Sequence, residues 1–206
     1  MGKSPLRRRL AVGSALLFAG LCVYAWYRGT VPDDTWREPS SADERVRCQL
    51  VESPVGTPVR CVAFVDLPSA ALIEAVRDYE SFPEIFDGPW GSVVLTSIQS
   101  KPPDRVHLDG RVEVLGAHWP IDMHIDHETT DEGFVAGWDA HDDEGRVNRG
   151  RWVVTAKGDA TAIVAYELEV QAPWSPTFLV NDVLLTRMKD PLRRIIEHAH
   201  AEHDGA

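Results

Sequence analysis

The chain has 206 residues, a length that suits one domain of ordinary size with a short appendage. Its hydrophobic content of 44% and charged content of 26% are typical of a globular protein and exclude a largely disordered one. The formal net charge is −11, and residues 1–30 carry basic side chains but no acidic ones. The remainder is therefore strongly acidic, which makes it a poor candidate for binding nucleic acid or for docking on anionic lipid.

The first predicted element is a hydrophobic helix behind a basic cluster. Lys3 and Arg7–Arg9 precede an uncharged apolar run from Leu10 to Tyr27. As a helix this run would be about 27 Å long, close to the hydrocarbon thickness of a bilayer. It ends in two aromatic residues, as membrane helices do at the interface. We expect residues 1–30 to be an uncleaved signal-anchor, with a cytoplasmic N-terminus and the domain on the periplasmic or extracellular face.

Three alternatives for this segment stay open. A cleaved signal peptide needs a small-x-small site after a shorter apolar core, and "YRGTVP" offers no good one. A lipoprotein signal needs a small residue before the modified cysteine, but Cys22 follows Leu21. A buried core helix is disfavoured by the flanking arginines.

Residues 31–45 are rich in proline, serine and charge and are interpreted as a flexible linker to one domain, residues 46–206. The domain begins with a predicted β-hairpin that turns near Pro54 and places Cys48 opposite Cys61. Outside the cytoplasm such a pair can form a disulfide. A one-residue slip would instead leave two buried thiols, and the sequence leaves both outcomes equally open.

A strand over 59–67 is followed by a helix that starts at Pro68 and Ser69. The helix runs into "AVRDYESFPEIFDGPW", where Pro83 disfavours helix at Phe82. The aromatic residues of this segment are then expected to lie at a bend of the chain and to pack over another part of the domain. They either form a lid over an opening or plug the end of a small core.

Six strands with short turns follow, and their spacing predicts antiparallel neighbours. Apolar and polar side chains alternate along them, as in a sheet with one solvent-facing side. For example, Ile121, Met123 and Ile125 oppose Asp122 and His124. The predicted strands are Ser92–Gln99, Arg105–Leu115, His118–Glu128, Phe134–Ala140, Arg151–Ala156 and Ala160–Val170.

The last segment is helical. Ser175 and Pro176 are typical of a helix start, and apolar residues then recur at helical spacing from Phe178 to Ala199. Pro191 must kink or restart the helix, with Asp190 as a possible second cap. A sheet curled around this helix would enclose apolar side chains on its concave face. The predicted fold class is α+β, preceded by the N-terminal transmembrane helix.

The sequence resembles the START-like (SRPBCC) superfamily of helix-grip domains, which includes lipid-transfer START proteins, coenzyme Q-binding proteins and polyketide cyclases. The resemblance rests on "VDLPSAALIEAVRDYESFPEIF" and on "SPTFLVNDVLLTRMKDPLRRI", and it spans residues 58–200. It implies a curved antiparallel sheet wrapped around a long C-terminal helix, with a hydrophobic tunnel between them.

The resemblance also implies which residues line the tunnel, with the aromatic-proline segment at its entrance. Tyr166 and Asn181 are the best inward-facing polar candidates. The predicted lining residues are Phe82, Phe86, Trp90, Leu108, Val112, Trp119, Ile121, Met123, Ile125, Phe134, Trp138, Trp152, Tyr166, Leu168, Phe178, Asn181, Leu185 and Met188.

Catalytic and metal-binding motifs are mostly missing from the sequence. "HETTD" at residues 127–131 is half of a zinc-protease motif and falls at a strand end rather than on a helix. His118, Asp122 and His124 share a strand face and could hold a metal, but that face points to solvent. We therefore predict no catalytic residue, metal or cofactor.

The sequence favours a membrane-anchored, exported domain that binds or transfers a lipid or another hydrophobic small molecule. One alternative is a cyclase-, aromatase- or hydrolase-like enzyme that uses the same cavity. The other is a non-binding interaction module of an envelope complex. The partners expected are a hydrophobic molecule and a membrane, with no nucleic acid.

Overall fold

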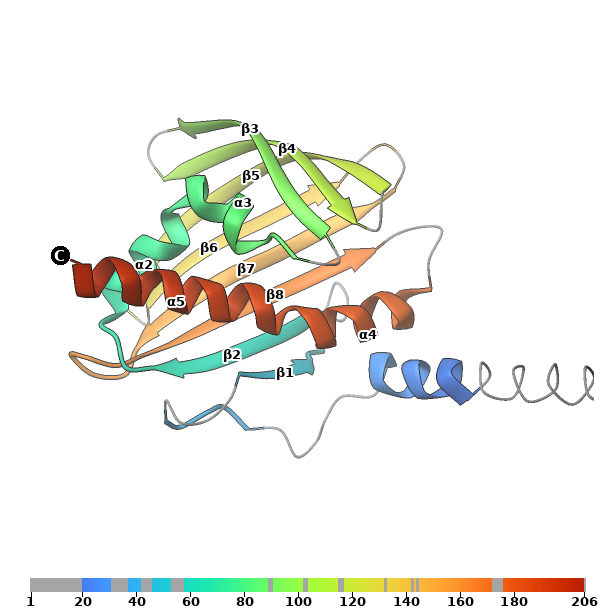
Figure 1. Cartoon of the computed structure of the whole chain (residues 1–206), viewed down its shortest axis with the longest axis horizontal. Helices are drawn as coiled ribbons and strands as arrows, with labels where there is room; N and C mark the ends of the chain where they lie inside the picture. Colours follow the sequence, from blue (N-terminus) through green and yellow to red (C-terminus); the bar gives the residue numbers. More distant parts are fainter. Residues whose placement is uncertain are drawn as a thin grey trace, which may run out of the picture.

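The fold is an eight-stranded antiparallel sheet curved around helices (Figure 1). The strand order is β1-β2-β8-β7-β6-β5-β4-β3. The computed structural model describes residues 20–30, 37–41, 46–52, 58–88, 91–101, 104–114, 117–131, 133–141, 143, 145–171 and 176–205. Its strands are β1 Arg47–Leu50, β2 Val59–Val65, β3 Gly91–Lys101, β4 Arg105–Val114, β5 Ala117–Thr130, β6 Gly133–His141, β7 Val147–Ala156 and β8 Ala162–Gln171.

The six consecutive strands predicted from the alternation are confirmed as antiparallel neighbours, β3 to β8. The prediction for β7 was too short, because the strand begins at Val147 rather than Arg151. Residues 147–150 lack a clear apolar alternation. They are strand because Val147 pairs with His141 on one side and with Gln171 on the other.

Strand β2, which precedes the helices, lies beside the last strand of the sheet and pairs with β8 along its whole length. The edge strand β1 pairs with β2 and places Cys48 opposite Cys61, as the hairpin register predicted. The two sulfurs are joined in a disulfide, with 4.0 Å between the Cα atoms.

The predicted helix after β2 is α2, Ser69–Arg77, which buries Leu72 and Val76. A 3-10 turn, η1 (Tyr79–Ser81), and a short helix, α3 (Phe82–Ile85), follow. The expectation that Pro83 would keep Phe82 out of helix was wrong: Phe82 has φ −56° and ψ −38°. Pro83 lies in the first turn of α3, where its missing N–H has no helical partner to lose.

The C-terminal helix is divided in two, as Pro191 predicted. Helix α4 spans Thr177–Arg187, α5 spans Lys189–Gly205, and the proline lies in the first turn of α5. One stripe of this helix pair is buried: Leu185, Met188, Leu192, Ile195 and Ala199. Helix α5 crosses the sheet and contacts α2 and β2, while α4 contacts β1, β2 and β8 (Figure 1).

Of the predicted N-terminal helix, residues 20–30 are described and are helical, and residues 1–19 lie outside the described residues. Within the described residues, no helix combines the length and apolarity that a membrane crossing requires. Of the predicted linker, residues 37–41 are described. There Pro39 is buried, and Glu38 accepts a hydrogen bond from Arg60 at 3.1 Å.

Candidate functional site

The concave face of the sheet is apolar, and its central part is fully buried. Ile125 on β5, Phe134 on β6 and Trp152 on β7 are each about 1% exposed. They belong to one core cluster with residues of α2, α3 and α5. Helix α2 contacts β7 and β8, and α3 contacts β3 and α5. Side chains of these helices therefore fill the middle of the curved sheet.

A chain of aromatic rings crosses this interior. Phe82 packs against Tyr79 at a centroid distance of 4.9 Å and against Phe86 at 5.3 Å. Phe86 continues to Tyr166 at 6.2 Å, and Tyr166 stacks on Trp152 at 4.1 Å. The aromatic-proline segment thus packs its rings into the core, with Tyr79 and Phe82 buried and Phe86 half-buried.

Trp152 carries a polar group that this core leaves unsatisfied. Its Nε1 is buried and has no hydrogen-bond partner among the described residues. A buried N–H without an acceptor costs free energy, so such groups usually have a partner in protein, water or ligand. By contrast, Trp138 on the same face donates from its Nε1 to Oδ1 of Asn148 at 2.9 Å. The two indole N–H groups of this face therefore differ, since that of Trp138 has an acceptor and that of Trp152 has none among the described residues.

Apolar side chains on the same face are only half-buried toward the start of β5. They include Trp119, Ile121 and Met123, together with Val112 on β4. The step from Met123 to Ile125 is the boundary, since Ile125 is fully buried. A half-buried apolar strip beside a closed core is a surface to which an apolar molecule can bind, because both lose contact with water there.

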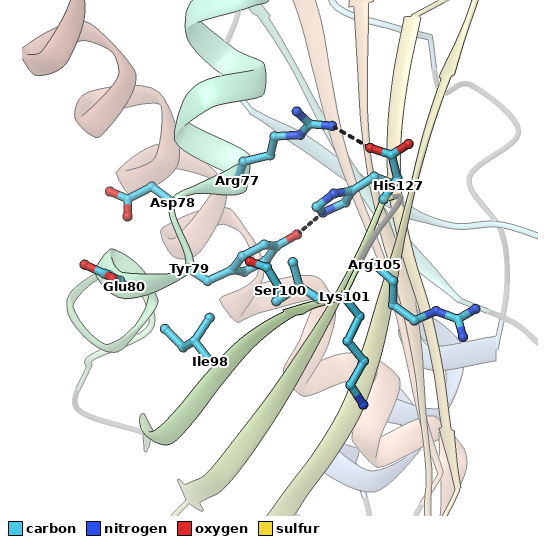
Figure 2. Close-up of a pocket in the computed structure, with 11 residues that line it drawn as sticks. Arg77, Asp78, Tyr79, Glu80, Ile98, Ser100, Lys101, Arg105 and His127 are labelled. Carbon is cyan, nitrogen blue, oxygen red and sulfur yellow. Dashed lines mark hydrogen bonds and ion pairs between the residues drawn. The ribbon is translucent and has the colours of Figure 1, made fainter.

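At the other end of β5, a cleft of about 500 Å³ opens between the end of α2 and strands β3, β4 and β5. Figure 2 shows its lining, in which Tyr79 and His127 point toward each other. The hydroxyl of Tyr79 lies 2.6 Å from Nε2 of His127. Arg77 and Asp104 form an ion pair of 3.9 Å at the same cleft.

The Tyr79–His127 pair is neutral at pH 7. Burial lowers the pKa of His127, and the charge of Arg77 lowers it further. Burial also raises the pKa of Tyr79 above its usual value. A neutral imidazole with its proton on Nδ1 accepts the phenolic hydrogen at Nε2. The pair can therefore orient a ligand or exchange a proton with one.

The predicted lining residues fall into three groups. The buried ones are Phe82, Leu108, Ile125, Phe134, Trp152, Tyr166, Asn181, Leu185 and Met188. The half-buried ones are Phe86, Val112, Trp119, Ile121, Met123, Trp138, Leu168 and Phe178. Trp90 lies outside the described residues.

Asn181 requires a correction. The resemblance implies that Asn181 faces the ligand, but its Nδ2 donates to the carbonyl of Gly29 at 3.1 Å. The same helix end is held by an ion pair of 3.2 Å between Arg28 and Asp182. A Cβ on Gly29 would overlap the carbonyl of Phe178, so glycine permits the close approach. Asn181 therefore binds the N-terminal helix to α4.

His127 is the site residue that sequence reasoning missed. It was considered only as part of a partial zinc motif. The signal was present in the alternation, because steps of two from Ile121 through Met123 and Ile125 reach His127. The register agrees, with Ile125 opposite Trp138 and His127 opposite Ala136.

The sequence matches no protein-family model and no curated protein. Similarity appears in solved structures. A STAR-related lipid transfer protein from Xanthomonas axonopodis has a TM-score of 0.61 at 12% identity, covering 81% of this chain and 99% of that one.

Human STARD10 has a TM-score of 0.62 at 13% identity, covering 82% of this chain and 80% of that one. An aromatase/cyclase from Streptomyces sp. R1128 has a TM-score of 0.51 at 12% identity, covering 69% and 93%. These proteins share the overall fold of this chain, so the fold that the sequence resemblance implies is confirmed. The fold of this chain is that of the START-like superfamily, the helix-grip fold.

Proposed function

We propose that this protein is a START-like domain that binds or transfers a lipid or another hydrophobic small molecule on the concave face of its sheet. The carrying observation is the half-buried apolar strip of Trp119, Ile121 and Met123, which lies beside the closed core on the same face. Val112 on the neighbouring strand β4 extends this apolar surface. The similar structure from Xanthomonas axonopodis is named as a lipid-transfer protein, which supports the same class of ligand.

The test is extraction of the purified full chain with organic solvent and identification of the extract by mass spectrometry. We expect one hydrophobic species in near-stoichiometric amount. An Ile121→Asp variant places a charge on the apolar strip, so it should retain less ligand than the parent. An extract no richer than that of an unrelated detergent-purified protein would contradict the proposal.

The N-terminal segment is proposed to anchor this domain to a membrane, on the periplasmic or extracellular side. The basic cluster before Leu10 and the apolar run to Tyr27 support that orientation. The Cys48–Cys61 disulfide is consistent with an oxidising compartment. A reporter enzyme fused after Ala206 should be active only outside the cytoplasm, and cytoplasmic activity would overturn this proposal.

A second candidate function is catalysis at the Figure 2 cleft, because the neutral Tyr79–His127 pair could transfer a proton to or from a ligand. Replacing Tyr79 by Phe and His127 by Gln separates the two functions. If the domain only carries its ligand, both variants should retain the extracted molecule unchanged in identity and close to the parental amount. Chemical conversion of the ligand by the parent, but not by either variant, would instead support an enzyme.

A further inference from the structure

The convex face of strands β4 and β5 brings together two histidines and two aspartates. His107 pairs with His124 across the strands, and Asp109 pairs with Asp122 two residues along. Cross-strand partners on one face lie close enough for their side chains to interact. The four side chains therefore form one compact group on the side of the sheet away from the helices.

Distances within this group are close to those of a metal site. Nε2 of His107 lies 2.8 Å from Oδ1 of Asp122 and 3.4 Å from Oδ1 of Asp109. The rings of His107 and His124 are 4.3 Å apart. One ligand atom from each of His107, Asp122 and His124 lies within 4.8 Å of the others.

We propose that His107, His124 and Asp122 bind a divalent transition-metal ion of the zinc class, with Asp109 as a fourth ligand or as the partner that orients His107. Two imidazoles and a carboxylate are ligands that zinc favours, at about 2.0–2.2 Å. Binding of one ion by all three requires His124 to approach the other two side chains, because the three ligand atoms are now separated by up to 4.8 Å while His107 and Asp122 are already in contact. His124 is exposed and can do so by rotating its side chain.

The bound ion would cross-link β4 to β5. Among the described residues, no helix makes more than a few contacts with β4 or β5. By contrast, α2 packs against β7 and β8. Their concave side carries the half-buried Val112, Ile121 and Met123. A metal on the convex side would stiffen this part of the sheet without entering the apolar interior.

The control comes from the same two strands. His118 lies 3.4 Å from Glu113 but has no second histidine opposite it, since its cross-strand partner is Glu113 itself. His200 and His203 near the C-terminus supply a background of incidental binding. A His118→Gln variant and a His200→Gln, His203→Gln double variant should therefore leave the proposed site intact.

The experiment is titration of the full chain, purified in detergent and stripped of metal, with Zn²⁺ alone in a calorimeter. We expect one saturable site per chain, weakened more than about tenfold by His107→Gln or by His124→Gln and unchanged in both control variants. Asp122→Asn changes a side chain that is 79% exposed, so this variant should fold normally. Weaker zinc binding by this variant would then come from the lost ligand and not from unfolding. Absence of a saturable site would overturn the proposal. Zinc binding by the His107 and His124 variants as tight as that of the parent, or loss of binding in the C-terminal double variant, would overturn it as well.

Discussion

Two isoleucines on the same face of β5 provide a direct test of where the closed core ends. Ile125 is about 1% exposed, whereas Ile121, four residues earlier, is half-buried. Replacing each by Asp makes the same chemical change at the two sides of the proposed boundary. Any difference between the variants must then come from the surroundings of the two positions.

The structure predicts very different costs. Ile125→Asp loses about 1.5–3 kcal/mol of apolar burial, and it also buries a carboxylate without a partner at a cost of several kcal/mol more. The sum approaches the whole stability of an ordinary domain, about 5–15 kcal/mol, so this variant should fail to fold or melt far below the parent. Ile121→Asp loses roughly half of one side chain's burial, about 1 kcal/mol, because its carboxylate can reach water.

Differential scanning calorimetry and solvent extraction measure the two effects on the same samples. The melting temperature of Ile121→Asp should fall by about 2–4 °C, and its bound hydrophobic molecule should be lost because a charge now lies on the binding strip. Ile121→Val is the matched control and should keep both. Equal destabilisation by the two Asp variants, or full retention of the molecule by Ile121→Asp, would refute the division of the concave face into a closed core and a binding strip.

Three further predictions concern stability. Changing Cys48 and Cys61 to Ser removes a bridge between residues 13 apart in sequence and should cost about 3 kcal/mol, measured by thermal melting against the oxidised parent; an unchanged melt would contradict it. His127 has a folded-state pKa below its unfolded value of about 6.5, mainly because of burial. Stability should therefore fall as pH drops below 6.5 toward the folded pKa, and His127→Gln should flatten that part of a denaturation–pH profile relative to the parent. A Cβ at Gly150 would overlap the ring of Trp138, so Gly150→Ala should cost about 1–3 kcal/mol in urea melts, whereas Gly158→Ala on a turn should cost less.

The order of elements was predictable from the sequence because it depends on local patterns. Alternation gave the strands from β3 to β8, and the Pro68–Ser69 and Pro191 signals gave the helix start and the break. The pairing of β2 with β8 was not predictable in this way. It joins segments about a hundred residues apart, and no short-range pattern specifies which distant strands pair with each other.

The candidate sites show how much depends on register. The predicted strands Arg105–Leu115 and His118–Glu128 leave a two-residue turn, which would have placed His107 opposite Asp126. In the structure β4 ends at Val114 and β5 begins at Ala117, so that His107 lies opposite His124. A shift of one residue at the turn kept every side chain on its predicted face but changed its partner. The face was therefore correct while the histidine pair was missed.

Asn181 illustrates a different limit. Its spacing on the terminal helix correctly predicts a buried side chain, but spacing cannot say which neighbour covers it. The partner is the carbonyl of Gly29, 152 residues away in the sequence. The unsatisfied Nε1 of Trp152 is equally invisible to pattern analysis, because it depends on what every surrounding side chain does.

The most direct test of hydrophobic-ligand binding uses the methionines of the chain. Of its three methionines, Met123 lies on the half-buried strip, and Met188 is buried in the packed core. Replacing them with a photoreactive methionine analogue, irradiating the full chain with its co-purified molecule and mapping the adducts by peptide mass spectrometry locates the ligand. We expect a hydrophobic adduct on the peptide that contains Met123, whereas the analogue at Met188 should react with its protein neighbours. Adducts confined to Met1, or no adduct at all, would contradict this expectation.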